Sequence, residues 1–112
     1  MYRESNLSYA RNIVSHFERD VMLKEPAKFY KRDMIHDGTL MLTKYNLVFV
    51  FTEENAGVFE SIPLKTIRRT AHSKVFKRVS GLKITKDDGI EFGFGVKKPE
   101  IYIETLGKLI ER

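Results

Sequence analysis

The residues whose types and spacing suggest chemistry in this sequence are mainly basic. The segment from Lys65 to Lys83 contains seven Lys or Arg residues and no Asp or Glu. The whole chain has 20 basic and 15 acidic residues, so removing these seven leaves 13 basic residues against 15 acidic ones. The positive charge is therefore local, which is typical of a surface patch that faces an anionic partner. A solvated strand-loop-strand that happens to be basic is the alternative.

A second basic group lies earlier in the chain, on or just after the first expected strand, and consists of Lys28, Lys31 and Arg32. The two groups together give the candidate residues for an anionic surface: Lys28, Lys31, Arg32, Arg68, Arg69, Lys74, Lys77 and Arg78. Strand alternation predicts that Arg69 lies on the same face as Ile67 and that Arg68 points outward.

Val75 and Phe76 lie inside the basic segment, between Lys74 and Lys77. They allow two interpretations. A loop could insert both side chains at a membrane surface while the cations meet head groups, each cation contributing about 1 kcal/mol. Alternatively, the two residues extend the strands and pack on the body of the domain, which is the interpretation we favour.

No spacing typical of an enzyme or of a metal site is visible. His16, His36 and His72 are scattered, so we expect surface or rim residues rather than metal ligands. Asp87 and Asp88 precede Gly89, a combination that favours a turn over a cation site. Gly93-Phe94-Gly95 lacks the third glycine of a dinucleotide loop and alternates like a strand. We therefore expect no catalytic residues, no cofactor and no metal.

Composition limits the class of protein further. A length of 112 residues corresponds to one domain, which we expect to span residues 1–112. No apolar run approaches the length of about 20 residues that spans a bilayer. The chain has no cysteine, so it forms no disulfide, and we expect a cytoplasmic protein, peripheral at a membrane if it binds one.

The pattern of apolar residues predicts an N-terminal amphipathic helix over residues 1–19. Apolar residues recur there at spacings of three and four, namely Leu7, Ala10, Val14, Phe17 and Val21, with Ile13 beside them. Pro26 ends any helix that reaches it. This stripe needs a surface on which to be buried, either the rest of the domain or the same helix of a second chain.

Strand patterns follow from Ala27 to Val96. Leu47–Phe51 is apolar on both faces, as a central strand is, and Lys44–Asn46 predicts a tight turn before it. Pro63 indicates a strand start or an edge strand. Asp88-Gly89 predicts a two-residue hairpin turn before an alternating strand over 90–96. A last amphipathic helix is expected over residues 98–111, with Pro99 in its first turn.

These stripes predict one shared core. Its expected members are Leu42, Leu47, Phe49, Ile90, Phe92, Phe94, Leu106 and Leu109. Short strands at regular spacing favour a sandwich or barrel over a parallel sheet.

Three motifs resemble those of GRAM domains and of bacterial pleckstrin-homology-like domains. They are the segment from Asp37 to Phe49, the segment Ile62-Pro63-Leu64-Lys65-Thr66-Ile67, and Leu82–Thr85 through Phe92-Gly93-Phe94 into the last helix. The resemblance covers residues 20–112. It implies a mainly β fold: a bent seven-stranded barrel capped by a C-terminal helix, to which this chain adds the N-terminal helix. It also implies a binding module rather than an enzyme.

The leading hypothesis for function is a peripheral module that binds an anionic membrane surface or a protein partner. A structural homo-oligomer, assembled through the N-terminal helix or a sheet edge, is the alternative. Nucleic-acid binding ranks below both, because no recognition helix or ribonucleoprotein-type motif is present.

In phosphoinositide-binding pleckstrin-homology domains the first hairpin supplies cations at a particular spacing. In this sequence Tyr30 and Asp33 interrupt that spacing.

Overall fold

The computed structural model describes residues 21–31, 34–52, 59–76 and 79–110, and for residues 31, 73–76, 79 and 80 it describes the backbone alone. The predicted helix over residues 1–19 lies outside these ranges, as do Arg32, Lys77 and Arg78. No helix within the described ranges is long and apolar enough to cross a bilayer.

Seven strands, one short 3-10 helix and one α-helix make up the described chain. The strands are β1 (Val21–Lys31), β2 (Met34–Thr43), β3 (Asn46–Phe51), β4 (Phe59–Pro63), β5 (Ile67–Phe76), β6 (Val79–Lys86) and β7 (Glu91–Gly95). The short helix η2 (Leu64–Thr66) joins β4 to β5, and α2 (Pro99–Ile110) follows β7.

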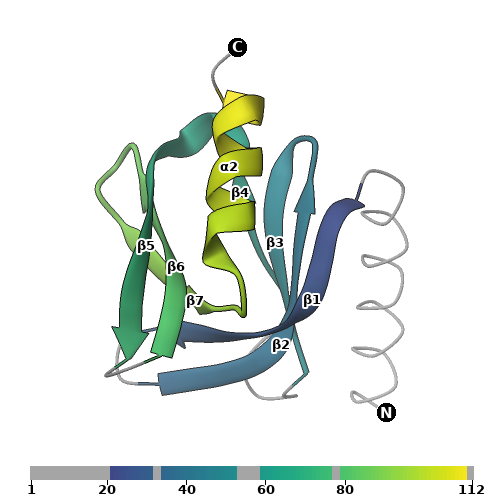
Figure 1. Ribbon diagram of the computed structural model, residues 1–112, viewed down its shortest axis with the longest axis vertical. Coiled ribbons are helices and arrows are strands. Elements are labelled where there is room, and N and C mark those ends of the chain that lie inside the picture. The colour runs from purple at the N-terminus through teal and green to yellow at the C-terminus, as the bar shows by residue number, and fades with distance from the viewer. Residues whose placement is uncertain (1–20, 32–33, 53–58, 77–78, 111–112) are drawn as a thin grey trace.

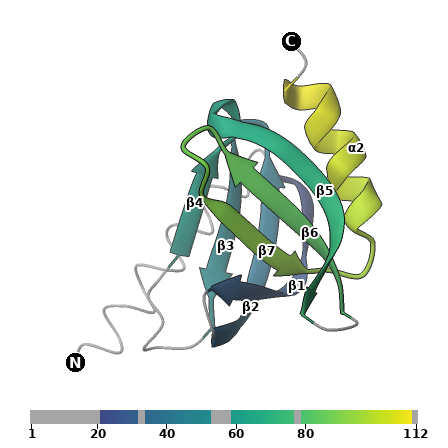
Figure 2. The same ribbon diagram turned by 90° about the vertical axis from the view of Figure 1, so that its left-hand side faces the viewer.

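The strands form a single bent antiparallel sheet in the order β4-β3-β2-β1-β7-β6-β5. Strand β1 pairs with β2 along its whole length but with β7 only through Lys28–Tyr30, so it belongs to both halves of the sheet. The two halves enclose the core, and α2 lies across the β5–β6 half (Figures 1 and 2). This arrangement confirms the predicted mainly β barrel with a C-terminal helix.

One cluster of side chains from all seven strands, η2 and α2 fills the interior. Phe29 lies at its centre, with its ring 5.0 Å from that of Phe94 and 5.3 Å from that of Phe49. Leu106 and Tyr102 bring α2 into the same cluster. Fully buried apolar side chains are the main favourable contribution to folding, at about 1.5–3 kcal/mol each.

The predicted core is correct at seven of eight positions, with Phe92 and Leu109 half-buried at its margin. Ile90 is the exception, because it is 53% exposed. Its position explains the error: β7 begins at Glu91, so Ile90 lies outside the strand, directly after the turn.

That turn is one residue longer than predicted. The N–H of Lys86 donates to the carbonyl of Ile90 at 2.9 Å, which leaves Asp87, Asp88 and Gly89 as a three-residue loop. Gly89 has a φ of +88°, a conformation that glycine adopts without strain. Asp88 accepts the N–H of Ile90 at 3.0 Å, so it shapes the turn as expected.

The first strand is longer than the sequence suggested. Val21, expected at the end of the helical stripe, begins β1, and Pro26 lies inside this strand opposite Thr39. Proline is tolerated there because β7 pairs only with Lys28–Tyr30, which leaves this part of β1 with one hydrogen-bonded neighbour. Pro63 ends β4, which is an edge strand as predicted.

A second apolar cluster lies on the opposite side of the first half of the sheet. Met41 of β2 is paired with Val48 of β3, and both side chains point away from the main core. These residues and Val50 are nevertheless buried. We call Met41, Val48 and Val50 the outer-face cluster.

Candidate binding surfaces

The strand register determines where the predicted cations lie. Lys28 of β1 pairs with Gly95 of β7, Gly95 with Gly81 of β6, and Gly81 with Ser73 of β5. Along β1 from Lys28 toward Lys31, the facing positions on β5 run from Ser73 toward Arg69. Along β1 in the opposite direction, the facing position on β5 is Lys74. The structure therefore places Lys31 and Lys74 on opposite sides of the Lys28 row.

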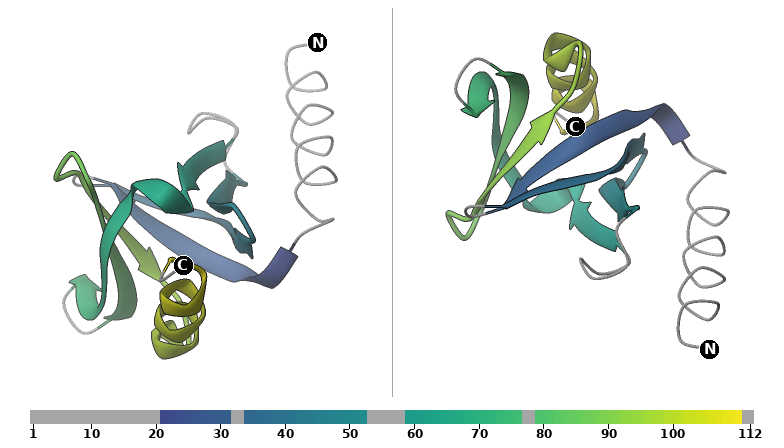
Figure 3. Two further views of the ribbon diagram at one scale, coloured as in Figure 1. Left: turned by 90° about the horizontal axis from the view of Figure 1, so that it is seen from above. Right: turned by 90° about the horizontal axis from the view of Figure 1, so that it is seen from below.

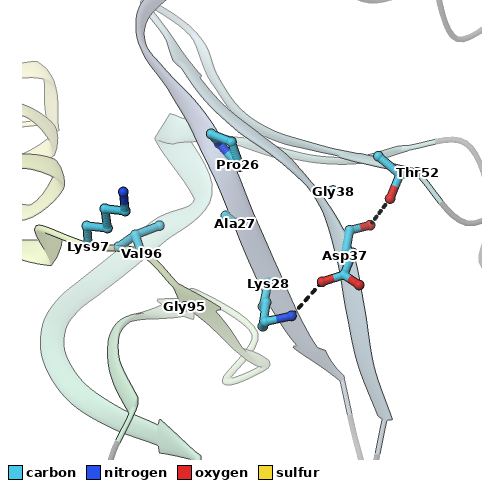
Figure 4. Close-up of a pocket in the computed structure, with 9 residues that line it drawn as sticks. All are labelled: Pro26, Ala27, Lys28, Asp37, Gly38, Thr52, Gly95, Val96 and Lys97. Carbon is cyan, nitrogen blue, oxygen red and sulfur yellow. Dashed lines mark hydrogen bonds and ion pairs between the residues drawn. The ribbon is translucent and has the colours of Figure 1, made fainter.

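Lys28 lies on the outer face of β1 and forms an ion pair of 2.6 Å with Asp37 of β2 (Figure 4). Both side chains are more than half exposed, so the pair contributes at most about 1 kcal/mol. Asp37 thus partly offsets the charge of Lys28 as a contact for an anionic ligand.

Lys28 and Asp37 line part of a cavity of about 540 Å³. Figure 4 shows Lys28 on β1, Asp37 and Thr52 on one side of this strand, and Val96 and Lys97, after the end of β7, on the other. Tyr30 lies over Gly95, where a Cβ atom would come within 3.1 Å of its ring. A side chain at position 95 would therefore require the ring of Tyr30 to shift slightly.

The end of the β1–β2 hairpin presents exposed apolar side chains. Met34 is 62% exposed and Ile35 is 41% exposed, and both begin β2 directly after Lys31, Arg32 and Asp33. Lys31 pairs with Met34 and Tyr30 with Ile35. Exposed apolar residues thus follow two of the predicted cations in the sequence. Sequence alone could not identify them, because Met34 and Ile35 read as ordinary strand residues.

Arg68 and Arg69 are both exposed at the start of β5. The predicted placement of Arg69 on the Ile67 face is wrong, because the register shifts between these residues: Ile67 pairs with Lys86, whereas Arg69 pairs with Thr85. A β-bulge of this kind inserts an extra residue and reverses the alternation that follows. Arg69 therefore lies on the outer face.

The backbone of Lys74 lies near the far end of β5, opposite Ser80. Phe76 pairs with Val79, so Val75 and Phe76 belong to β5 as we favoured, although their side chains are not described. Lys77 and Arg78 fall outside the described residues.

A second cavity, of about 750 Å³, lies at another end of the barrel. The β2–β3 turn contributes Lys44 and Tyr45, η2 contributes Leu64 and Lys65, and the last turn of α2 contributes Ile110. Leu64 donates its N–H to the carbonyl of Tyr45 at 2.9 Å, which fixes η2 against the turn. Three segments distant in the sequence meet here, so no local motif could have indicated this cleft.

Within the described residues, no three His, Asp or Glu side chains lie close enough together to hold a metal ion. His72 is exposed as expected. His36 differs from the expectation of a surface or rim residue, because it is buried and packs edge-on against Phe51 with ring centres 5.3 Å apart. His16 lies outside the described residues.

Tyr102 is a buried ionisable residue whose pKa is shifted. Burial raises the pKa of its phenol, and the negative charge of Glu25 raises that pKa further. Its hydroxyl has no hydrogen-bond partner among the described residues. The phenol therefore stays protonated inside the core, where its ring adds apolar contact area while its hydroxyl is costly to bury.

The sequence matches no family model and no curated protein. Solved structures do resemble the chain. The C-terminal domain of an unknown protein from Leishmania infantum aligns with a TM-score of 0.73 at 13% identity, over 94% of this chain and 97% of that one.

Pleckstrin-homology domains align almost as well. The N-terminal domain of Vps36 gives a TM-score of 0.65 at 11% identity, over 81% of this chain and 78% of its own. The domain of Slm1, solved with inositol-4-phosphate, gives 0.63 at 16% identity, over 81% and 96% respectively. The described chain therefore has the fold of a pleckstrin-homology domain.

Proposed function

We propose that this chain is a non-catalytic binding module, of the GRAM type within the pleckstrin-homology-like fold, and that the end of its β1–β2 hairpin binds anionic membrane surfaces. The observation that carries the proposal is the exposure of Met34 and Ile35, which follow Lys31 and Arg32 closely in the sequence. Apolar side chains can enter the interfacial region of a bilayer while neighbouring cations contact lipid phosphates.

The magnitudes fit weak, reversible binding. Complete burial of Met34 and Ile35 would contribute at most about 1.5–3 kcal/mol each. Each cation near an anionic surface adds about 1 kcal/mol. The cations predicted elsewhere, on β5, would add to long-range attraction, which physiological salt weakens over a Debye length of about 8 Å. Slm1, which shares the fold, was solved with inositol-4-phosphate, and this supports an anionic ligand.

Co-sedimentation with vesicles tests the proposal, using phosphatidylcholine alone and phosphatidylcholine with 30% phosphatidylserine as probes. We expect binding to the anionic vesicles only, and at least a tenfold loss of binding in Ile35→Asp. The matched control is Ile101→Asp, because Ile101 is also 41% exposed but lies on α2. Equal loss in both variants, or no binding of the unmodified chain at low salt, would contradict the proposal.

A protein partner is the second candidate, supported by the cleft of about 750 Å³. Leu64 and Ile110 give this cleft apolar walls, and Lys44 and Lys65 are exposed at its rim. Such a lining suits a peptide that combines an apolar anchor with acidic residues. Titration with a labelled acidic peptide, compared between the unmodified chain and Lys44→Glu/Lys65→Glu, tests this candidate. Unchanged affinity in the variant would exclude the cleft.

A further inference from the structure

The outer-face cluster is unusual for its position. Met41 and Val48 have no exposed surface, and Val50 is only 8% exposed, although all three point away from the main core. An antiparallel sheet with one face on the core commonly has a polar, solvated second face. Burial of apolar residues on this second face implies that another part of the protein covers them.

Among the described residues, the half-buried apolar side chains packed against the cluster are those of Val21 and Phe59. Helix α2 packs instead on β5, β6 and η2, on the other half of the barrel (Figure 2). The β2–β3 face lies away from this helix in the views of Figure 3.

Two segments outside the described residues are close enough in the sequence to be considered. Residues 53–58 adjoin Phe59 but read Glu-Glu-Asn-Ala-Gly-Val, which provides little apolar surface. Residues 1–20 join the chain at Val21, which itself packs against the cluster. They carry the apolar stripe of Leu7, Ala10, Ile13, Val14 and Phe17.

We propose that residues 1–20 bind in cis to the outer-face cluster through this stripe. Its span is sufficient: a helix from Leu7 to Phe17 is about 15 Å long. Three paired strands are about 10 Å across. The entry point fits as well, because Val21 lies opposite Thr43, near one edge of the cluster. The segment is thus a structural part of the domain, and the β2–β3 face is closed to other partners.

The chain contains its own probes for this contact, because methionine oxidation depends on exposure. Met41 has no exposed surface, whereas Met34 is 62% exposed and serves as the internal reference. Hydrogen peroxide is applied to the unmodified chain, and the oxidation rate of each methionine is followed by peptide mass spectrometry. We expect Met34 to react quickly and Met41 to be protected.

The test variant is Val14→Asp/Phe17→Asp, which places charges in the stripe. It should raise the oxidation rate of Met41 at least tenfold and leave that of Met34 unchanged. The matched control, Asn12→Asp/Ser15→Asp, adds the same charge to the opposite side of the predicted helix and should leave Met41 protected. Should the test variant fail to fold, Phe17→Ala provides a milder change with the same expected direction.

Two results would overturn the proposal. One is an oxidation rate of Met41 that stays low when the stripe is disrupted in a folded protein. The other is a dimer in light scattering whose dilution to monomer exposes Met41, because a second copy would then supply the cover. Neither result bears on vesicle binding by the β1–β2 hairpin.

Discussion

The outer faces of the two halves of the barrel differ sharply. On β2 and β3, Met41 and Val48 are buried. On the outer face of β5 and β6, Arg69 is exposed and Lys83 forms a 3.2 Å ion pair with Glu91. Both halves contribute the same kind of apolar residues to the core, so the inner faces do not distinguish them. The outer faces show which half needs a cover and which half can meet solvent or a partner.

The largest difference is expected for a charge placed on each outer face. Val48→Asp should cost about 3–5 kcal/mol in the free energy of unfolding, because the carboxylate would be buried without a partner. Thr85→Asp on β6 should change stability by about 0.5 kcal/mol or less, as surface substitutions do. Urea denaturation of both variants measures this difference. Equal costs would show that the two faces are equivalent.

Helix α2 should contribute almost as much, through its core-facing side. Leu106 has no exposed surface, so Leu106→Ala should lower the free energy of unfolding by about 2–5 kcal/mol. Ile101→Ala on the exposed side of α2 is the control and should cost far less. A loss below about 1 kcal/mol for Leu106→Ala would mean that the helix does not close the barrel.

A glycine in each half allows a smaller comparison. A Cβ at Gly38 of β2 would collide with the carbonyl oxygen of Val50 and lie 2.5 Å from the ring of Phe49. Gly38→Ala should therefore cost about 1–3 kcal/mol. A Cβ at Gly95 of β7 meets the movable ring of Tyr30 at 3.1 Å, so Gly95→Ala should cost less. Thermal unfolding of the two variants determines the order, and a larger cost at Gly95 would reverse the packing argument.

Tyr102 gives the smallest effect, and that effect depends on pH. Its pKa is higher in the folded state than the ordinary value of 10, because burial disfavours the phenolate. The stabilisation of the fold that is linked to this pKa difference is thus fully present below pH 10 and is lost as pH rises further. Tyr102→Phe should change stability at pH 7 by about 1 kcal/mol or less, because the hydroxyl lacks a partner among the described residues.

The same variant should lessen the fall of melting temperature above pH 10. Melting curves of both proteins between pH 8 and 11 measure this change. An unaltered alkaline slope would mean that Tyr102 does not contribute to it.

Much of the fold could be predicted from periodicity. The apolar residues on both faces of Leu47–Phe51 correctly indicated an internal strand, and the alternation before Phe94 indicated one buried face. Local irregularities could not be predicted: the bulge between Ile67 and Arg69 reversed a face, and Pro26 concealed the first half of β1. Periodicity has no means of detecting an inserted residue.

The candidate surfaces were predictable only in part. Clustering of charge in the sequence identified cations, but the register separates Lys31 from Lys74 along the sheet. Exposure at Met34 and Ile35 depends on where the hairpin ends, and the cleft beside Lys44 depends on contacts between distant segments. These features arise from tertiary structure, which composition and spacing do not encode locally.

The most direct test of membrane binding is the environment of a fluorescent probe on the β1–β2 hairpin. The chain has no cysteine, so Ile35→Cys and Ile101→Cys each accept a single thiol-linked, polarity-sensitive dye. Anionic vesicles should shift the emission of the dye at position 35 to shorter wavelength and leave the dye at position 101 unchanged. Emission at position 35 that does not respond while the protein is bound, or an equal shift at both positions, would contradict the assignment of this hairpin as the membrane contact.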